Sequence, residues 1–123
     1  MADRTLRNCR VLVVEDEYYL AEELMMTLED AGATVLGPVG SLQDSLAAID
    51  AEARIDGAVL DMNLRGEMVF PVADRLQELG VPFVFTTGYD SSALPHRFEQ
   101  IIRCEKPINL QRVTQAIGRV IHP

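Results

Sequence analysis

Residues 57–63 read Gly57-Ala58-Val59-Leu60-Asp61-Met62-Asn63, a run of small and apolar residues that leads to a carboxylate. A short, continuous apolar run of this kind predicts a strand that is buried on both faces, as in a parallel sheet. Open α/β sheets bind ligands in the crevice beyond the carboxyl ends of their strands, so Asp61 is expected to point into that crevice. Three other polar groups follow predicted strands in the same way: Glu15-Asp16, Thr86-Thr87-Gly88 and Lys106-Pro107.

Five segments are predicted to be strands: residues 11–14, 34–39, 56–60, 82–86 and 101–105. Between them, apolar residues recur at helical spacing, which predicts amphipathic helices. The apolar stripes are Leu20, Leu24 and Leu28; Leu42, Leu46 and Ile49; Val69, Val72, Leu76 and Leu79; and Leu110, Val113, Ile117 and Val120. Residues 61–67 are expected to form a loop.

The ends of these elements carry their own signals. Ser41 and Asn109 are predicted N-caps, and Gly32 and Gly80 stand where glycine ends a helix. Pro38 places the second strand at an edge of the sheet. The pattern over residues 90–100 is weaker and contains Pro95, which disfavours helix at the preceding residue. A short or irregular fourth helix is expected there.

Strands that alternate with helices predict a doubly wound, five-stranded parallel sheet of the flavodoxin-like kind, with helices on both faces. The expected strand order is 2-1-3-4-5, in one domain over residues 1–123 without an output domain. In this order strands 1 and 3 are neighbours. Glu15, Asp16 and Asp61 are therefore expected to meet in one crevice.

The composition narrows the class of protein. A net charge of -8 argues against nucleic acid and against an anionic membrane surface as partners. The sequence has no secretory signal and no apolar stretch of transmembrane length, so a cytoplasmic protein is expected. Cys9 and Cys104 lack metal-ligand spacing, and we expect two separate thiols.

Three carboxylates in one crevice repel one another, and a hard divalent cation removes that conflict. Mg²⁺ prefers oxygen ligands and keeps several waters. Asp16 and Asp61 are predicted as direct ligands, Glu15 as a partner of a bound water, and Asn63 as the donor of a backbone carbonyl. The alternative is structural: acidic residues at a helix N-terminus are ordinary partners of the helix dipole.

Other groups at the same sheet edge favour a phosphoryl group as a second ligand. Lys106 offers a mobile charge suited to phosphate, although it would equally serve as a counter-ion for the carboxylates. Thr87 offers a hydroxyl donor, or is simply a strand residue. Gly88 leaves room beside it for a ligand, and a cis peptide at Pro107 would aim the lysine side chain.

Taken together, these residues resemble a response-regulator receiver domain of bacterial two-component signalling, and the resemblance covers essentially the whole chain. Its marks are Glu15-Asp16, Asp61, Thr87 and Lys106-Pro107, in the expected order at the expected strand ends. The run Phe85-Thr86-Thr87-Gly88-Tyr89 also resembles the F-A-T-G-Y signature of a subgroup of single-domain receivers, with threonine in place of alanine.

The resemblance implies that Asp61 takes a phosphoryl group, with Mg²⁺, from a phosphohistidine on a histidine kinase or a histidine phosphotransfer protein. Lys106 would pair with one phosphoryl oxygen. The Thr87 hydroxyl would move to another and carry the segment after the fourth strand with it. Such a protein is a signalling switch or a phosphorelay member, and its only catalysis is its own phosphorylation and dephosphorylation. The sequence does not name the downstream partner.

One position on the predicted fifth strand departs from the commonest receiver pattern. Arg103 stands where many receivers have an aromatic switch residue, so Tyr89 or the loop after it is expected to report the switch. Tyr89 and Asn63 flank the expected phosphoryl site, at positions that in this family influence how fast water removes the phosphate. Replacing Tyr89 with alanine is expected to shorten the phosphorylated lifetime.

Two other functions compete with this interpretation. A small Mg²⁺-dependent aspartyl phosphatase would carry Asp-x-Asp, whereas this chain has Asp61 and then Asn63, whose amide cannot transfer the proton. A protein-interaction module that works without phosphorylation is the other alternative. A nucleotide- or flavin-binding domain is disfavoured, because Glu15-Asp16-Glu17 would repel phosphate in the first loop.

Overall fold

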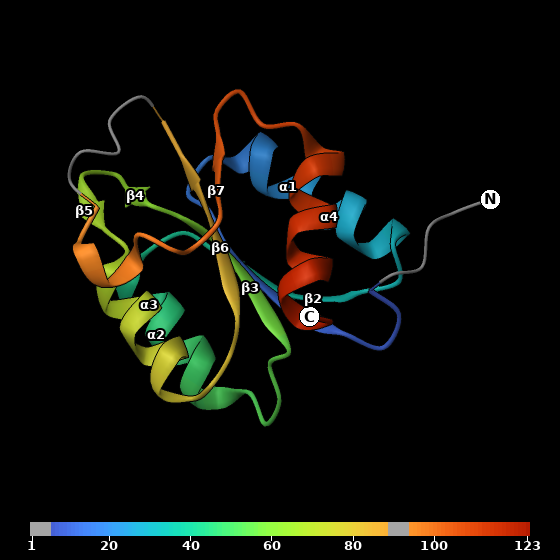
Figure 1. The fold of residues 1–123 in the computed structure, drawn as a ribbon, viewed down its shortest axis with the longest axis horizontal. Coiled ribbons are helices and arrows are strands. Elements are labelled where there is room, and N and C mark those ends of the chain that lie inside the picture. The colour runs from blue at the N-terminus through green and yellow to red at the C-terminus, as the bar shows by residue number, and fades with distance from the viewer. Residues whose placement is uncertain (1–5, 89–93) are drawn as a thin grey trace.

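The protein is a five-stranded parallel sheet covered by helices on both faces. The structure, a computed structural model, describes residues 6–88 and 94–123. The strands are β1 (Arg10–Val14), β2 (Thr34–Val39), β3 (Gly57–Asp61), β6 (Phe83–Thr87) and β7 (Arg103–Glu105). Their order is β2-β1-β3-β6-β7, which confirms the predicted order 2-1-3-4-5 (Figure 1).

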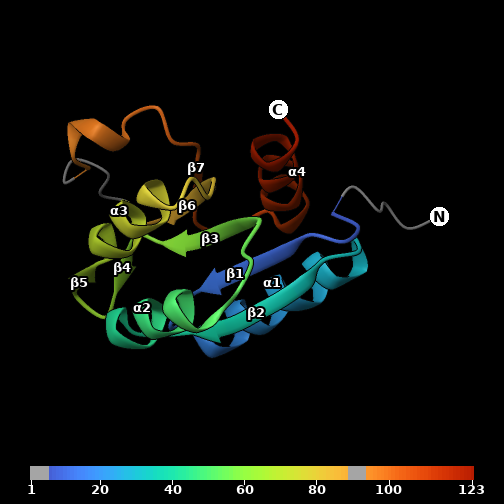
Figure 2. The ribbon, with the colours of Figure 1, turned by 90° about the horizontal axis from the view of Figure 1, so that it is seen from below.

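The helices form two layers, one on each side of the sheet. They are α1 (Tyr18–Asp30), α2 (Leu42–Ala51), α3 (Phe70–Glu78) and α4 (Leu110–Ile121). Figures 1 and 2 show α2 and α3 on one face and α1 and α4 on the other. Because strand side chains alternate between faces, β1 supplies Leu12 to the core under α2 and α3 and Val13 to the core under α1 and α4.

The central strands are buried throughout, as their continuous apolar sequence predicts. The register pairs Val14 of β1 with Leu60 of β3, and Asp61 with Thr86 of β6. Three neighbouring strands therefore end at the same level. This register brings the residues after β1 beside the end of β3.

The segment predicted as a loop contains a small hairpin, so that prediction was wrong. Its strands are β4 (Asn63–Leu64) and β5 (Glu67–Met68), which pair antiparallel. The two residues between them, Arg65 and Gly66, both have positive φ, 52° and 89°. Two-residue hairpin turns favour this backbone, but Arg-Gly is a weaker signal for it than Asn-Gly or Asp-Gly.

The crossing from β6 to β7 holds little helix. Among the described residues of this segment, the helical part is one 3-10 turn, η1 (His96–Phe98), as a short or irregular fourth helix predicts. Phe98 is fully buried and lies 5.8 Å from Phe85 and 5.6 Å from Phe70 between ring centroids. Its ring fixes this turn to the core under α2 and α3.

Several smaller predictions are confirmed. The side chains of Ser41 and Asn109 cap α2 and α4, and Gly32 and Gly80 have positive φ after α1 and α3. The strand β2, which contains a proline, lies at an edge of the sheet. Cys9 and Cys104 are free, buried thiols.

We predict that Phe98→Ala destabilises the protein by about 3–5 kcal/mol, because it empties a fully buried aromatic site. Urea denaturation followed by circular dichroism would measure the loss. Tyr19→Ala removes an aromatic ring that is 74% exposed and is the control, with a change within about 0.5 kcal/mol expected. Equal losses in the two variants would contradict the role assigned to Phe98.

Candidate functional site

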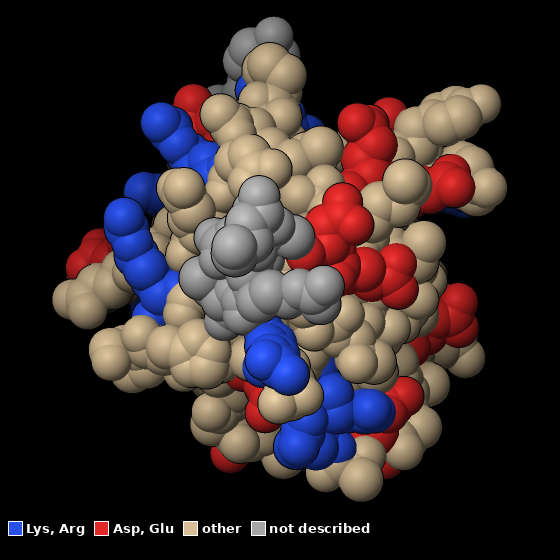
Figure 3. All heavy atoms as spheres, turned by 90° about the vertical axis from the view of Figure 1, so that its right-hand side faces the viewer, with Lys and Arg blue, Asp and Glu red and all other residues tan. Residues whose placement is uncertain are grey.

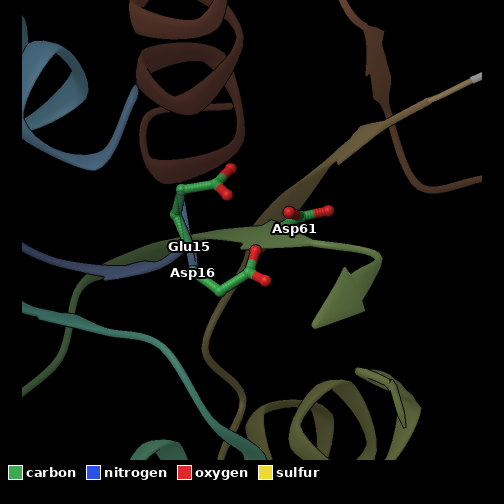
Figure 4. Close-up of side chains that lie close together, drawn as sticks. All are labelled: Glu15, Asp16 and Asp61. Carbon is green, nitrogen blue, oxygen red and sulfur yellow. The ribbon is translucent and has the colours of Figure 1, made fainter. Parts of the chain in front are cut away.

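Three carboxylates meet at the carboxyl edge of the sheet, as the strand order predicts. Glu15 and Asp16 directly follow β1, and Asp61 is the last residue of β3. One carboxylate oxygen from each residue lies within 4.8 Å of the others. Figure 4 shows the three side chains reaching one space from these two strand ends. Glu15 and Asp61 are buried, whereas Asp16 lies nearer the surface.

Lys106 faces two of these carboxylates. Its Nζ lies 3.0 Å from Asp61 Oδ2 and 3.5 Å from Glu15 Oε1. Its backbone N–H donates to the carbonyl of Thr87 at 2.7 Å, which holds the end of β7 against β6. Burial alone would lower the pKa of Lys106, but the hydrogen bond and charge of Asp61, with the charge of Glu15, raise it. This is the one lysine in the sequence, and the other ten basic residues are arginines.

Glu15 is a buried carboxylate whose surroundings favour its protonated form. Burial and the neighbouring Asp61 raise its pKa to about 8, although Lys106 and the N–H of Glu17 favour its charged form. Its Oε2 accepts from that N–H at 3.0 Å. Its Oε1 is buried and has no hydrogen-bond partner among the described residues. An acceptor without a donor is a suitable partner for a cation or for a cation's water.

Asn63 shapes the hairpin that follows Asp61. Its backbone N–H donates to Asp61 Oδ1 at 3.2 Å, and its side-chain Oδ1 accepts from the N–H of Gly66 at 2.6 Å. The side-chain amide is therefore occupied in the hairpin turn. The role predicted for the Asn63 carbonyl as a metal ligand stays a prediction.

Thr87 lies at the end of β6, and its hydroxyl makes only long contacts with the described residues. Its Oγ1 is 3.8 Å from Met62 Sδ and 3.4 Å from the carbonyl oxygen of Gly88. An added Cβ at Gly88 would meet no described atom within 4 Å. With respect to the described residues, the Thr87 hydroxyl therefore keeps the capacity to bind a ligand in the crevice.

The other predicted switch residues are placed as follows. Arg103 is exposed on β7, away from the core, and the Lys106–Pro107 peptide is cis. Tyr89 lies outside the described residues.

Arg65 is a site residue that the sequence reasoning did not assign. Its Nε lies 3.6 Å from Asp16 Oδ2, and its side chain is 80% exposed. The contact depends on the β4–β5 turn, which brings residue 65 back over the crevice. The Arg-Gly dipeptide between two short polar segments was the available signal, and it is a weak one.

The residues present fit a hard divalent cation. Three carboxylates supply oxygen ligands, and the buried Oε1 of Glu15 lacks a hydrogen-bond donor. An acidic crevice that faces a lysine at the carboxyl edge of a doubly wound sheet is the arrangement expected of a receiver domain.

Known proteins support this class. The solution structure of SdrG from Sphingomonas melonis Fr1 is 33% identical, with a TM-score of 0.75 over 92% of this chain and 96% of that chain. A response regulator receiver protein from Sinorhizobium medicae is 24% identical, with a TM-score of 0.80 over 94% and 96% of the two chains. The sensory transduction protein LytT of Bacillus cereus is 30% identical over 89% of this chain and 46% of its own length.

The chain belongs to the family of response-regulator receiver domains. It spans less than half of the length of the LytT and LytR relatives that it matches. No family model matches the chain.

The raised pKa of Glu15 predicts a pH dependence of stability in the metal-free protein. An unfolded Glu15 loses its proton near pH 4.5, whereas the folded one keeps it until about pH 8. The native state therefore binds more protons between these values, and its stability falls as pH rises from 5 to 8, by at most roughly 5 kcal/mol. Urea unfolding in EDTA would measure the slope.

Glu15→Gln is expected to flatten that slope, because the amide does not titrate. Glu17→Gln changes an exposed carboxylate two residues away and should leave the slope unchanged. A wild-type stability that rises over this pH range would refute the assignment.

Proposed function

We propose that the protein is a phosphoryl-accepting signalling switch in which Asp61 is the acceptor. The observation that carries this proposal is the ion pair between Lys106 Nζ and Asp61 Oδ2 at 3.0 Å, next to two further carboxylates in the sheet-edge crevice. A nucleophilic carboxylate with a lysine beside it suits transfer of a charged phosphoryl group.

The proposed step is a transfer between two proteins. A carboxylate oxygen of Asp61 attacks the phosphorus of a phosphohistidine on a histidine kinase or a histidine phosphotransfer protein. The new O–P bond forms as the P–N bond breaks, and the departing imidazole nitrogen keeps the electron pair and takes up a proton. The product on this chain is an acyl phosphate, a mixed anhydride of Asp61.

Mg²⁺ would be held by the carboxylates of Glu15, Asp16 and Asp61 and by the Asn63 carbonyl, and it supplies neutralisation of the phosphoryl charge. Lys106 keeps the acceptor carboxylate oriented through the 3.0 Å contact. After transfer its ammonium group pairs with a phosphoryl oxygen in place of the carboxylate oxygen.

The output of the switch begins at Thr87. Among the described residues, its hydroxyl makes only two long contacts, and a phosphoryl oxygen is a better acceptor than either of these partners. Turning the hydroxyl toward the phosphate biases the segment after β6 and so changes the surface offered to a downstream partner or to the next member of a relay.

The two alternative functions have less support. In an aspartyl phosphatase, residue 63 would act as a general acid, but the Asn63 amide already accepts a hydrogen bond within the hairpin turn. A module that works without phosphorylation would not need Lys106 between Asp61 and Glu15.

Among the described residues, no helix combines the length and the apolar character needed to cross a bilayer.

We predict that a small acyl-phosphate donor adds one phosphoryl group to the wild type in the presence of Mg²⁺, and none to Asp61→Asn. Intact-mass spectrometry would measure the addition, with and without EDTA. Asp30→Asn is the matched control, because Asp30 is an exposed carboxylate at the end of α1. Failure of the folded wild type to gain mass, also with a candidate kinase, would favour the module that works without phosphorylation.

Adjacent threonines allow a matched test of the output. Thr87→Ala is expected to accept the phosphoryl group. It should lose most of the amide chemical-shift changes that activation causes outside the site, because the hydroxyl that would bind the phosphoryl oxygen is gone. Thr86→Ala removes a buried hydroxyl that has no hydrogen-bond partner in the described part of the chain, and it is expected to keep the full response.

Amide NMR spectra with and without beryllium trifluoride would measure this, because that group gives an activated conformation of the related SdrG. A full response in Thr87→Ala would show that the output does not pass through this hydroxyl.

A further inference from the structure

We propose that Arg65 competes with Mg²⁺ for Asp16 and thereby sets the Mg²⁺ concentration at which the site fills. The inference rests on the metal site of the proposed function. It concerns a residue of the hairpin after β3 that the proposed phosphoryl transfer itself does not use.

The three carboxylates are divided between two cations. Lys106 lies within 3.5 Å of Glu15 and 3.0 Å of Asp61. Asp16 is left to the other cation, with its Oδ2 at 3.6 Å from Arg65 Nε. Among the described residues, Arg65 is the cation within 4 Å of Asp16. In the metal-free protein, Arg65 therefore provides the charge that a metal ion would otherwise provide there.

The backbone of the hairpin fixes the position of Arg65 above the crevice. Arg65 has a φ of 52°, an uncommon value for a residue with a side chain, and it is held by the turn that Asn63 and Gly66 close. Leu64, just before it, is 2% exposed and fixes the hairpin to the core. The turn thus presents the guanidinium at the mouth of the crevice.

The ion pair between Arg65 and Asp16 is weak enough for a divalent cation to break it. At 3.6 Å it is an ion pair without a hydrogen bond, and the Arg65 side chain is 80% exposed. Exposed pairs of this kind are weak and sensitive to salt. Mg²⁺ brings two charges to three carboxylates, so it displaces the guanidinium from Asp16. Glu22 lines the same pocket and offers the released Arg65 another carboxylate.

The test is an isothermal titration of unphosphorylated protein with Mg²⁺ at low ionic strength. Arg65→Gln, which keeps the length of the side chain and removes its charge, is expected to bind Mg²⁺ roughly two- to fivefold more tightly than the wild type. Arg65→Lys keeps the charge and should stay near the wild type. The gain in Arg65→Gln should shrink in 0.5 M salt as screening weakens the competing pair.

Arg54→Gln is the matched control. Arg54 is also exposed and pairs with a carboxylate, Asp56, at 3.3 Å, but it precedes β3 at the opposite end of the strand. Its Mg²⁺ affinity should equal that of the wild type. A similar gain in Arg54→Gln would mean that net charge alone sets the affinity, which overturns the proposal.

Equal or weaker Mg²⁺ binding by Arg65→Gln also overturns the proposal and leaves the acceptor role of Asp61 standing. Absence of Mg²⁺ binding in both proteins overturns the proposal and the metal site together. A protein that shows the predicted gain but takes no phosphoryl group supports the competition and refutes only the acceptor role, so the two failures are distinguishable.

Discussion

Repulsion among three carboxylates, held together by the register of two buried strands, is the constraint on which the site depends. Because β1 and β3 pair so that Val14 faces Leu60, the residues that follow them have no freedom to separate. Lys106 offsets part of the repulsion from the end of β7, and the proton held by Glu15 offsets another part. A divalent cation would relieve the remaining repulsion, which is the physical reason for the proposed metal site.

The sheet also explains how a small number of residues can form the site. Each chemical group stands at the end of a different strand: Asp61 after the apolar run of β3, Thr87 at the end of β6 and Lys106 after β7. The hydrogen bond from the backbone N–H of Lys106 to the carbonyl of Thr87 joins the end of β7 to the end of β6. In the proposed switch, this hydrogen bond links the lysine beside Asp61 to the end of β6. The surface itself is of mixed charge: Figure 3 shows acidic and basic side chains on the same face.

Much of this could be predicted from the sequence, because strand burial, the strand order and the ends of the strands follow from apolar patterns and from the rules for parallel sheets. The hairpin at residues 63–68 could not, since its turn uses Arg65 at positive φ, and local propensity does not favour that residue there. The contact of Arg65 with Asp16 depends on that turn and was missed with it. The raised pKa of Glu15 also could not be predicted from the sequence. Its causes are burial and the carboxylate of Asp61, which is 46 positions away in the chain and close only in the folded structure.

The two edges of the sheet have a consequence for the behaviour of the protein at high concentration. β2 contains Gly37 and Pro38, and β7 is only three residues long, with charged residues at both ends. Proline cannot donate to a neighbouring strand, and short, charged edges are poor templates for one. Crowded copies of this chain are therefore protected from stacking edge to edge into extended sheets. Protection of this kind would suit the proposed switch, whose contacts with partners have to be reversible.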